Sequence, residues 1–142
     1  MKPEVHVEVK NLPVMTVAYI RHTGPYRGDG KLFEGLFGRL YAWAGPRGLF
    51  NPAPPRSAVI YHDDPNITEE SKQRLSACLM VPSDTRVDGE IGKMEIAAGT
   101  YMVARFTLGV DEFGEAWDWV FGQWFPVSGY QPADGPCFEW YD

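Results

Sequence analysis

The closing stretch of the sequence, residues 136–142 (PCFEWYD), places a single glutamate in the middle of an aromatic run. Such a run is typical of a β-strand that is at least partly buried. Removing an ionised carboxylate from water costs free energy unless a cation or a hydrogen-bond donor meets it. Alternation along a strand therefore leaves two outcomes open: Glu139 points to water while Phe138 and Trp140 point inward, or Glu139 points into a binding site.

Length, charge and cysteine usage narrow the class of protein. A chain of 142 residues fits one domain, and its 13 basic and 19 acidic residues give a net charge of −6, which disfavours direct binding to nucleic acid. Cys78 and Cys137 have no metal-ligand spacing and lie in apolar runs, so we expect reduced core thiols, no metal and no cofactor. No signal peptide and no long apolar span are evident, which predicts a cytoplasmic protein without a membrane partner.

The spacing of apolar residues predicts the strands and helices that must position Glu139. Alternating residues predict strands, and the first two are expected to form a hairpin. Apolar residues at helical spacing predict two core-facing helices, of which the second is capped by Asp111. The predicted strands are 5–9, 15–22, 57–62, 75–81, 91–96, 101–107 and a closing strand that ends at Tyr141, and the predicted helices are 31–43 and 113–124.

The order of these elements indicates an internal duplication. Residues 4–82 and 89–142 each follow a strand, strand, helix, strand order within a single domain, residues 1–142, and Trp124 stands where Trp43 stands in the first copy. The first copy has a further strand, 75–81, which the second copy lacks. We therefore predict an open sheet edge that a homodimer partner or a strand of another protein could cover.

Five motifs in register resemble the gyrase-inhibitor-like (GyrI-like) small-molecule-binding family, related to the effector-binding domains of AraC-type and MerR-type regulators. The motifs are RHTGPY (21–26), YHDDP (61–65), AGTY (98–101), WFPVSGY (124–130) and GPCFEWY (135–141). The resemblance implies an α+β fold with duplicated β-β-α-β-β units, two antiparallel sheets related by pseudo-two-fold symmetry, one helix on each, and a ligand groove between them. No helix-turn-helix pattern is evident, so the resemblance implies a stand-alone multidrug-binding module.

The resemblance also implies a set of ligand-binding residues. Glu139 matches the family glutamate that meets cationic aromatic ligands in the groove, Tyr101 matches a groove aromatic, and Tyr61 occupies the equivalent of the closing strand in the first copy. A carboxylate among aromatic rings attracts a delocalised cation through charge and through cation–π contacts. For the remaining candidates, ordinary core packing is the competing explanation. These are Tyr26, Phe106, Trp119 and Trp140.

The sequence leaves several functions to weigh. The leading hypothesis is a binding protein that takes up amphipathic, cationic aromatic molecules for drug or toxin sequestration or for sensing. One alternative is a hydrolase of reactive cyclopropane-type natural products, with Glu139 as general base beside Tyr101 or Tyr61. Another alternative is a protein that inhibits DNA gyrase through a protein–protein contact. The sequence does not name the ligand.

Overall fold

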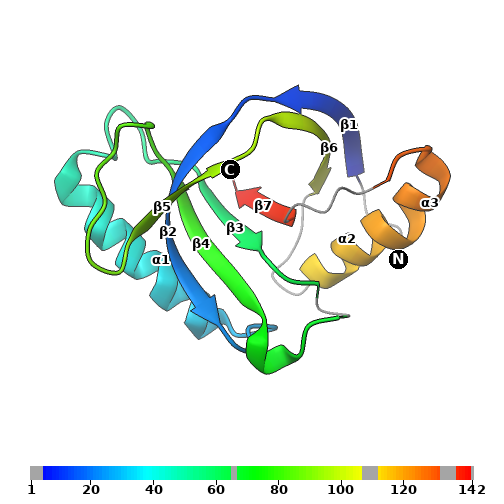
Figure 1. Cartoon of the computed structure of the whole chain (residues 1–142), viewed down its shortest axis with the longest axis horizontal. Helices are drawn as coiled ribbons and strands as arrows, with labels where there is room; N and C mark the ends of the chain where they lie inside the picture. The colour runs from blue at the N-terminus through cyan, green and yellow to red at the C-terminus, as the bar shows by residue number, and fades with distance from the viewer. Residues whose placement is uncertain (1–4, 65–66, 107–111, 132–136, 142) are drawn as a thin grey trace. The chain divides into compact units, whose positions relative to one another are not determined.

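The computed structural model describes residues 5–64, 67–106, 112–131 and 137–141 (Figure 1). Within these ranges the strands are β1 (Val5–Leu12), β2 (Met15–Thr23), β3 (Ser57–Tyr61), β4 (Arg74–Met80), β5 (Gly92–Ile96), β6 (Gly99–Phe106) and β7 (Cys137–Tyr141). The α-helices are α1 (Gly30–Ala44), α2 (Phe113–Trp119) and α3 (Phe125–Ser128). A π-helical turn, Val120–Trp124, joins α2 to α3, and 3-10 turns lie at Gly45–Arg47 and Glu70–Lys72.

The strands form two antiparallel sheets. β1 pairs with β6 in a two-stranded sheet, and the five-stranded sheet has the order β5-β2-β4-β3-β7. The two-stranded sheet and α2 belong to a compact unit of residues 1–13 and 98–135, whereas the five-stranded sheet and α1 belong to a unit of residues 14–97 and 136–142. The predicted α+β class, with two antiparallel sheets, is confirmed.

The predicted hairpin between the first two strands is wrong. β1 pairs along its whole length with β6, from Val5 opposite Phe106 to Leu12 opposite Gly99, whereas β2 pairs with β4 and β5. The connection between β1 and β2 is Pro13-Val14, which lacks the glycine and asparagine chemistry of a tight hairpin turn. The chain instead passes from one compact unit to the other at this point.

Each sheet combines strands from both predicted repeats. β1 comes from the first repeat and β6 from the second, while β5 and β7 of the second repeat flank three strands of the first. The described sheets have two and five strands, but because neither sheet belongs to one repeat, these counts do not measure the repeats separately. The duplication, its boundaries at 4–82 and 89–142, and the strand missing from the second copy therefore stay predictions.

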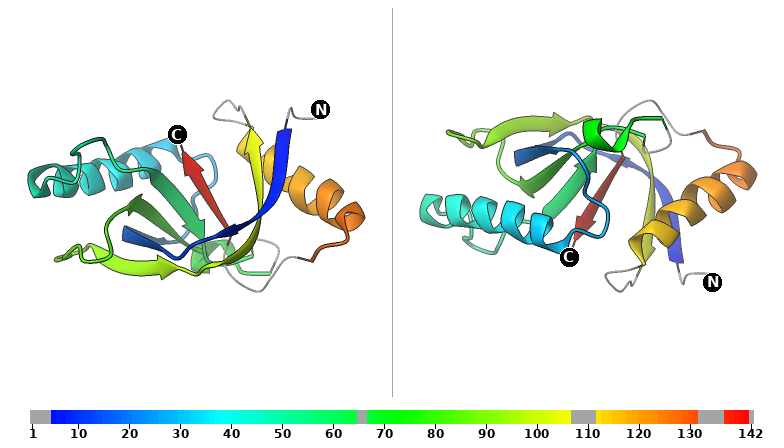
Figure 2. Two further views of the ribbon diagram at one scale, coloured as in Figure 1. Left: turned by 90° about the horizontal axis from the view of Figure 1, so that it is seen from above. Right: turned by 90° about the horizontal axis from the view of Figure 1, so that it is seen from below.

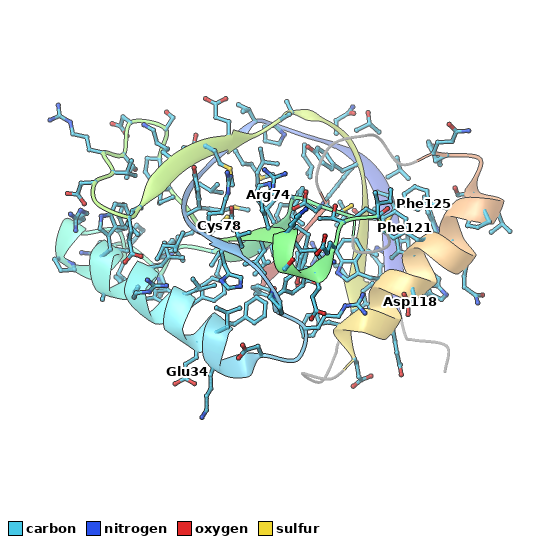
Figure 3. All side chains as sticks on the ribbon, turned by 60° about the horizontal axis from the view of Figure 1, so that its bottom comes forward. Glu34, Arg74, Cys78, Asp118, Phe121 and Phe125 are labelled. Carbon is cyan, nitrogen blue, oxygen red and sulfur yellow. The ribbon has the colours of Figure 1, made fainter. Side chains whose placement is uncertain are left out.

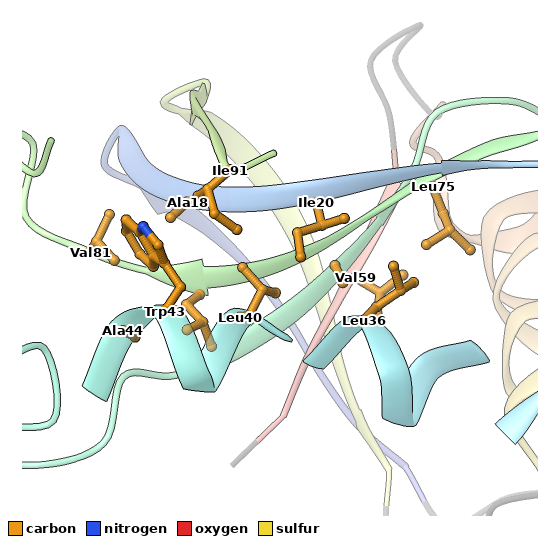
Figure 4. Packing of buried hydrophobic residues seen from close by; sticks show 12 residues of the cluster. Ala18, Ile20, Leu36, Leu40, Trp43, Ala44, Val59, Leu75, Val81 and Ile91 are labelled. Atoms are coloured by element: carbon orange, nitrogen blue, oxygen red, sulfur yellow. The ribbon is translucent and has the colours of Figure 1, made fainter. Parts of the chain in front are cut away.

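Helix α1 covers one face of the five-stranded sheet (Figure 2). Asp29 caps the helix, because its carboxylate accepts a hydrogen bond from the Leu32 amide at 3.1 Å. The helix faces the sheet with residues spaced at helical periodicity, and β2 and β4 meet it with alternate residues. The buried cluster that results is shown in Figure 4 and comprises Ala18, Ile20, Leu36, Leu40, Trp43, Ala44, Val59, Leu75, Ala77, Leu79, Val81 and Ile91.

Beyond this core, the short strand β7 completes the five-stranded sheet at the outer side of β3. Its register places Tyr141 opposite Ser57, Glu139 opposite Val59 and Cys137 opposite Tyr61. None of the helices in the described ranges is long and apolar enough to cross a membrane.

Candidate functional site

Glu139 lies on the face of the five-stranded sheet that α1 covers. Directly opposed residues of an antiparallel pair present their side chains to the same face, and Glu139 is opposed by Val59, which is fully buried in the core beneath α1. The strand is at the edge of the sheet, and Glu139 is half-buried. Of the two outcomes that the sequence leaves open, the structure therefore shows Glu139 pointing toward the helix-covered side.

Two tyrosine hydroxyls meet the Glu139 carboxylate. The Tyr141 hydroxyl donates to Glu139 Oε1 at 2.7 Å, and the Tyr61 hydroxyl donates to the same oxygen at 3.0 Å. The Tyr61 ring in turn lies 5.6 Å, centroid to centroid, from the ring of Tyr26. We call Glu139, Tyr61, Tyr141 and Tyr26 the Glu139 cluster; it contains residues of β3, β7 and the connection between β2 and α1.

The tyrosines of the Glu139 cluster are held in their neutral form. Burial raises the pKa of Tyr61 and of Tyr141 far above the usual range, and the negative charge of Glu139 raises both further. Burial also raises the pKa of Tyr26. The phenols therefore act as hydrogen-bond donors, and the charge of the cluster is the carboxylate. A carboxylate with aromatic rings around it is suited to a cation that also has an aromatic or apolar body.

An open hollow of about 400 Å³ lies beside the Glu139 cluster, within the same compact unit. Its walls are Tyr41, Pro54, Pro55, Arg56, Ser57 and Tyr141. Tyr141 links the hollow to the carboxylate, because this side chain lines the hollow and its hydroxyl is bonded to Glu139. The Tyr41 ring is stacked on Phe50 at 5.7 Å, and Phe37 meets the Tyr141 ring edge to face at 6.5 Å. Two aromatic residues, Tyr41 of α1 and Tyr141 of β7, thus form part of the wall, beside the prolines, Arg56 and Ser57.

The structure brings three of the predicted site residues together, namely Glu139, Tyr61 and Tyr26. Trp140 belongs to the same strand as Glu139, but alternation turns it to the opposite face, where the Arg56 guanidinium lies 4.8 Å from its ring centroid. Three further candidates, Tyr101, Phe106 and Trp119, belong to the other compact unit. In that unit the Phe106 and Trp119 rings meet edge to face at 6.0 Å.

Sequence reasoning missed Tyr141. The signal was present, because residues two apart in a strand share a face, and Tyr141 stands two positions after Glu139. The hollow beside Tyr141 could not be found in this way, since its walls come from a helix, a proline-rich loop and two strands that are distant in sequence.

A second polar cluster lies among the strands of the same sheet. Ser76 of β4 is fully buried; its hydroxyl oxygen accepts a hydrogen bond from Arg21 Nε at 3.4 Å and lies 2.8 Å from His62 Nε2. Burial, together with the positive charges of Arg21 and Arg74, lowers the pKa of His62. A neutral His62 can accept a hydrogen bond from the Ser76 hydroxyl, whose oxygen accepts a hydrogen bond from Arg21. We read this cluster as structural.

Comparison with known proteins relates the chain to one family. A family model described as the GyrI-like small molecule binding domain matches residues 6–142. The DNA gyrase inhibitor of Edwardsiella piscicida is 30% identical over an alignment of 143 positions, which covers 96% of this chain and 86% of that protein. DNA gyrase inhibitor 2 of Dickeya dadantii is also 30% identical, over 91% of this chain and 80% of that protein.

Solved structures share the fold. The EcmrR chain in a complex with DNA matches with a TM-score of 0.73 and 20% identity over 96% of this chain, which spans 49% of that longer chain. An integron cassette protein from the mobile metagenome of Vibrio cholerae matches with a TM-score of 0.62 and 16% identity over 95% of this chain. At these identities the likeness concerns the fold alone. Together with the match over residues 6–142, these findings show that the chain belongs to the GyrI-like small-molecule-binding domain family.

Proposed function

We propose that this domain binds amphipathic, cationic aromatic molecules and that Glu139 supplies the charge that attracts them. The observation that carries the proposal is the carboxylate of Glu139, which is half-buried on the helix-covered face of the sheet and hydrogen-bonded by the neutral phenols of Tyr61 and Tyr141. The phenols fix the carboxylate without neutralising it. A ligand cation therefore meets a negative charge that is already oriented.

The chemistry of the cluster favours a class of ligands over a single compound. Each contact between a cation and a ring face contributes about 0.5–2 kcal/mol, and neither this term nor the attraction to a carboxylate requires one ligand shape. The hollow beside Tyr141, at about 400 Å³, lies in the size range of small-molecule sites. Binding of several flat cations fits a role in drug or toxin sequestration or in sensing.

Isothermal titration calorimetry tests this proposal by measuring the affinity for a cationic dye, crystal violet, and for a neutral dye, Nile red. We expect Glu139→Gln to weaken binding of the cation by about tenfold to a hundredfold, because one charge is lost from the site, and to change binding of the neutral dye little. Glu95→Gln is the matched control, since Glu95 is an exposed strand residue on β5, at the opposite edge of the same sheet. Equal cation affinity in Glu139→Gln and the native chain would overturn the proposal.

A hydrolase would use the same groups. Glu139 would act as the general base that activates water against an electrophilic ring, and the hydrogen bonds from Tyr61 and Tyr141 would orient its carboxylate. Mass spectrometry of a cyclopropane-bearing electrophile after incubation separates the two roles: recovery of the intact compound supports binding alone, and a hydrated product supports a hydrolase.

The names of the relatives favour a third candidate function, inhibition of DNA gyrase. Two relatives that are 30% identical to this chain are named DNA gyrase inhibitors. A supercoiling assay with purified gyrase and increasing amounts of this chain tests the point directly. A concentration-dependent loss of supercoiling supports inhibition, and unchanged supercoiling at a large excess of the chain excludes it.

A further inference from the structure

The helical segment of residues 113–128 carries a row of aromatic rings that is distinct from the Glu139 cluster. Trp117 and Phe121 are stacked at 5.9 Å between ring centroids with an interplanar angle of 21°, and Phe121 and Phe125 are stacked at 5.4 Å with an angle of 28°. Phe121 and Phe125 are labelled along this segment in Figure 3. We call Trp117, Phe121 and Phe125 the aromatic row.

The π-helical turn accounts for the alignment of the row. In an α-helix, four residues advance about 40° beyond a full turn, so rings spaced by four residues drift around the helix. The turn Val120–Trp124 is π-helical, and its wider i→i+5 bonding counteracts that drift. Rings at positions 117, 121 and 125 therefore stay in one line along the segment. Single π-helical turns inside helices are found often at functional sites.

The row is not the core-facing side of the segment. Ala116 and Val120 are each only 6% exposed, whereas Phe121 is 42% exposed and Trp117 and Phe125 are partly buried. Two further apolar side chains at the end of this segment, Val127 and Tyr130, are also strongly exposed. Exposed apolar side chains that gather on one segment are typical of a surface that interacts with a partner.

The charged residues of this segment all have the same sign. Residues 112–131 contain Glu112, Glu115 and Asp118 and no lysine, arginine or histidine. Glu115 and Asp118 are exposed on α2. Acidic side chains repel nucleic acid and anionic membranes and attract a basic surface.

We propose that this segment is a docking surface for a basic, amphipathic segment of a partner protein. Because the three rings are stacked on one another, their faces are turned toward neighbouring rings and mainly their edges face outward. A row of ring edges is suited to the aliphatic side chains of an amphipathic helix, while the exposed carboxylate of Asp118, which follows Trp117 in the sequence, pairs with a lysine or arginine of that helix. The row spans nine residues, from Trp117 to Phe125, or about 12 Å of helix, which matches about two turns of a partner helix.

The test uses the full ¹⁵N-labelled chain and a synthetic amphipathic helix composed of lysine and leucine. We expect its amide shift changes to cluster in residues 113–130, and a peptide with glutamate in place of lysine to cause none. Asp118→Lys is expected to weaken binding of the lysine peptide by about fivefold, because an attraction between exposed opposite charges is replaced by a repulsion. Phe121→Ala, which truncates an exposed ring, is expected to weaken it further while the circular dichroism spectrum stays native.

Glu34→Lys is the matched control, because it changes the net charge by the same amount at an exposed position of α1. The proposal is overturned if Glu34→Lys and Asp118→Lys weaken peptide binding equally, since the net charge of the chain then explains the binding. It is also overturned if the shift changes lie outside residues 113–130. Concentration-dependent shifts in the same residues without peptide would assign the surface to a second copy of this chain and would likewise refute a basic partner.

Discussion

Alkaline pH should destabilise this domain through the two phenols that donate to Glu139. The folded-state pKa values of Tyr61 and Tyr141 lie above that of an unfolded tyrosine, which is about 10. The stability that these phenols contribute is therefore fully present below about pH 10 and is lost as the pH rises through the folded-state pKa. Above pH 10 the unfolded chain releases protons that the folded chain retains.

The size of the effect follows from proton counting. Each phenol that stays protonated only in the folded state lowers the free energy of unfolding by about 1.4 kcal/mol per pH unit, so Tyr61 and Tyr141 together give about 2.7 kcal/mol per pH unit. Urea unfolding followed by circular dichroism, between about pH 10 and pH 11.5, measures this slope. Tyr61→Phe and Tyr141→Phe should each make the slope shallower by about 1.4 kcal/mol per pH unit.

Comparing variants at the same pH removes the contributions of all other groups that titrate in this range. Tyr130→Phe is the matched control, because it removes the hydroxyl of an exposed tyrosine that is not part of the Glu139 cluster. Should Tyr61→Phe show the native slope as well, the phenol is not kept protonated by burial beside Glu139, and the reasoning about the Glu139 cluster fails.

Three further predictions concern the scaffold, and urea unfolding measures each of them. Leu40→Ala should lower the free energy of unfolding by about 2–5 kcal/mol, because Leu40 is fully buried between α1 and the sheet; a loss below about 1 kcal/mol would contradict this packing. Asp29→Ala should cost about 0.5–2 kcal/mol through loss of the hydrogen bond to the Leu32 amide, and Asp29→Asn should restore most of it. Gly92→Ala should cost about 1–3 kcal/mol, because a Cβ there would come within 2.6 Å of the Tyr19 ring, and the cost should largely vanish in a Tyr19→Ala background.

The local elements could be predicted from the sequence, whereas their pairing could not. Helical spacing from Leu32 to Trp43 predicts α1, and alternation predicts every described strand to within a few residues. Alternation says nothing about which strand lies beside which. The hairpin prediction failed for that reason: β1 finds its partner in β6, far along the chain, and Pro13 separates β1 from β2.

The candidate site could likewise be predicted only in part, because its residues come together through strand pairing. Resemblance pointed to Glu139 and Tyr61, and the structure brings them within 3.0 Å because β7 pairs with β3. Tyr101 belongs to the other compact unit, and this could not be predicted from the sequence because it depends on the long-range pairing of β6 with β1. The π-helical turn after Trp119 was also not predictable, because apolar spacing from Phe113 to Trp124 fits an uninterrupted α-helix equally well.

The pairing of β7 with β3 has a consequence for the order of events during synthesis. β3 is made well before β7, and α1 can already cover the sheet formed by β3, β4 and β2 when the ribosome is still adding the second half of the chain. During that interval the outer edge of β3 has unpaired backbone groups, which can recruit a strand from another chain. When residues 137–141 pair with β3, they cover this edge and at the same time bring Glu139 within hydrogen-bond distance of Tyr61. The strand that brings the charge of the candidate site is thus also the strand that covers the outer edge of β3.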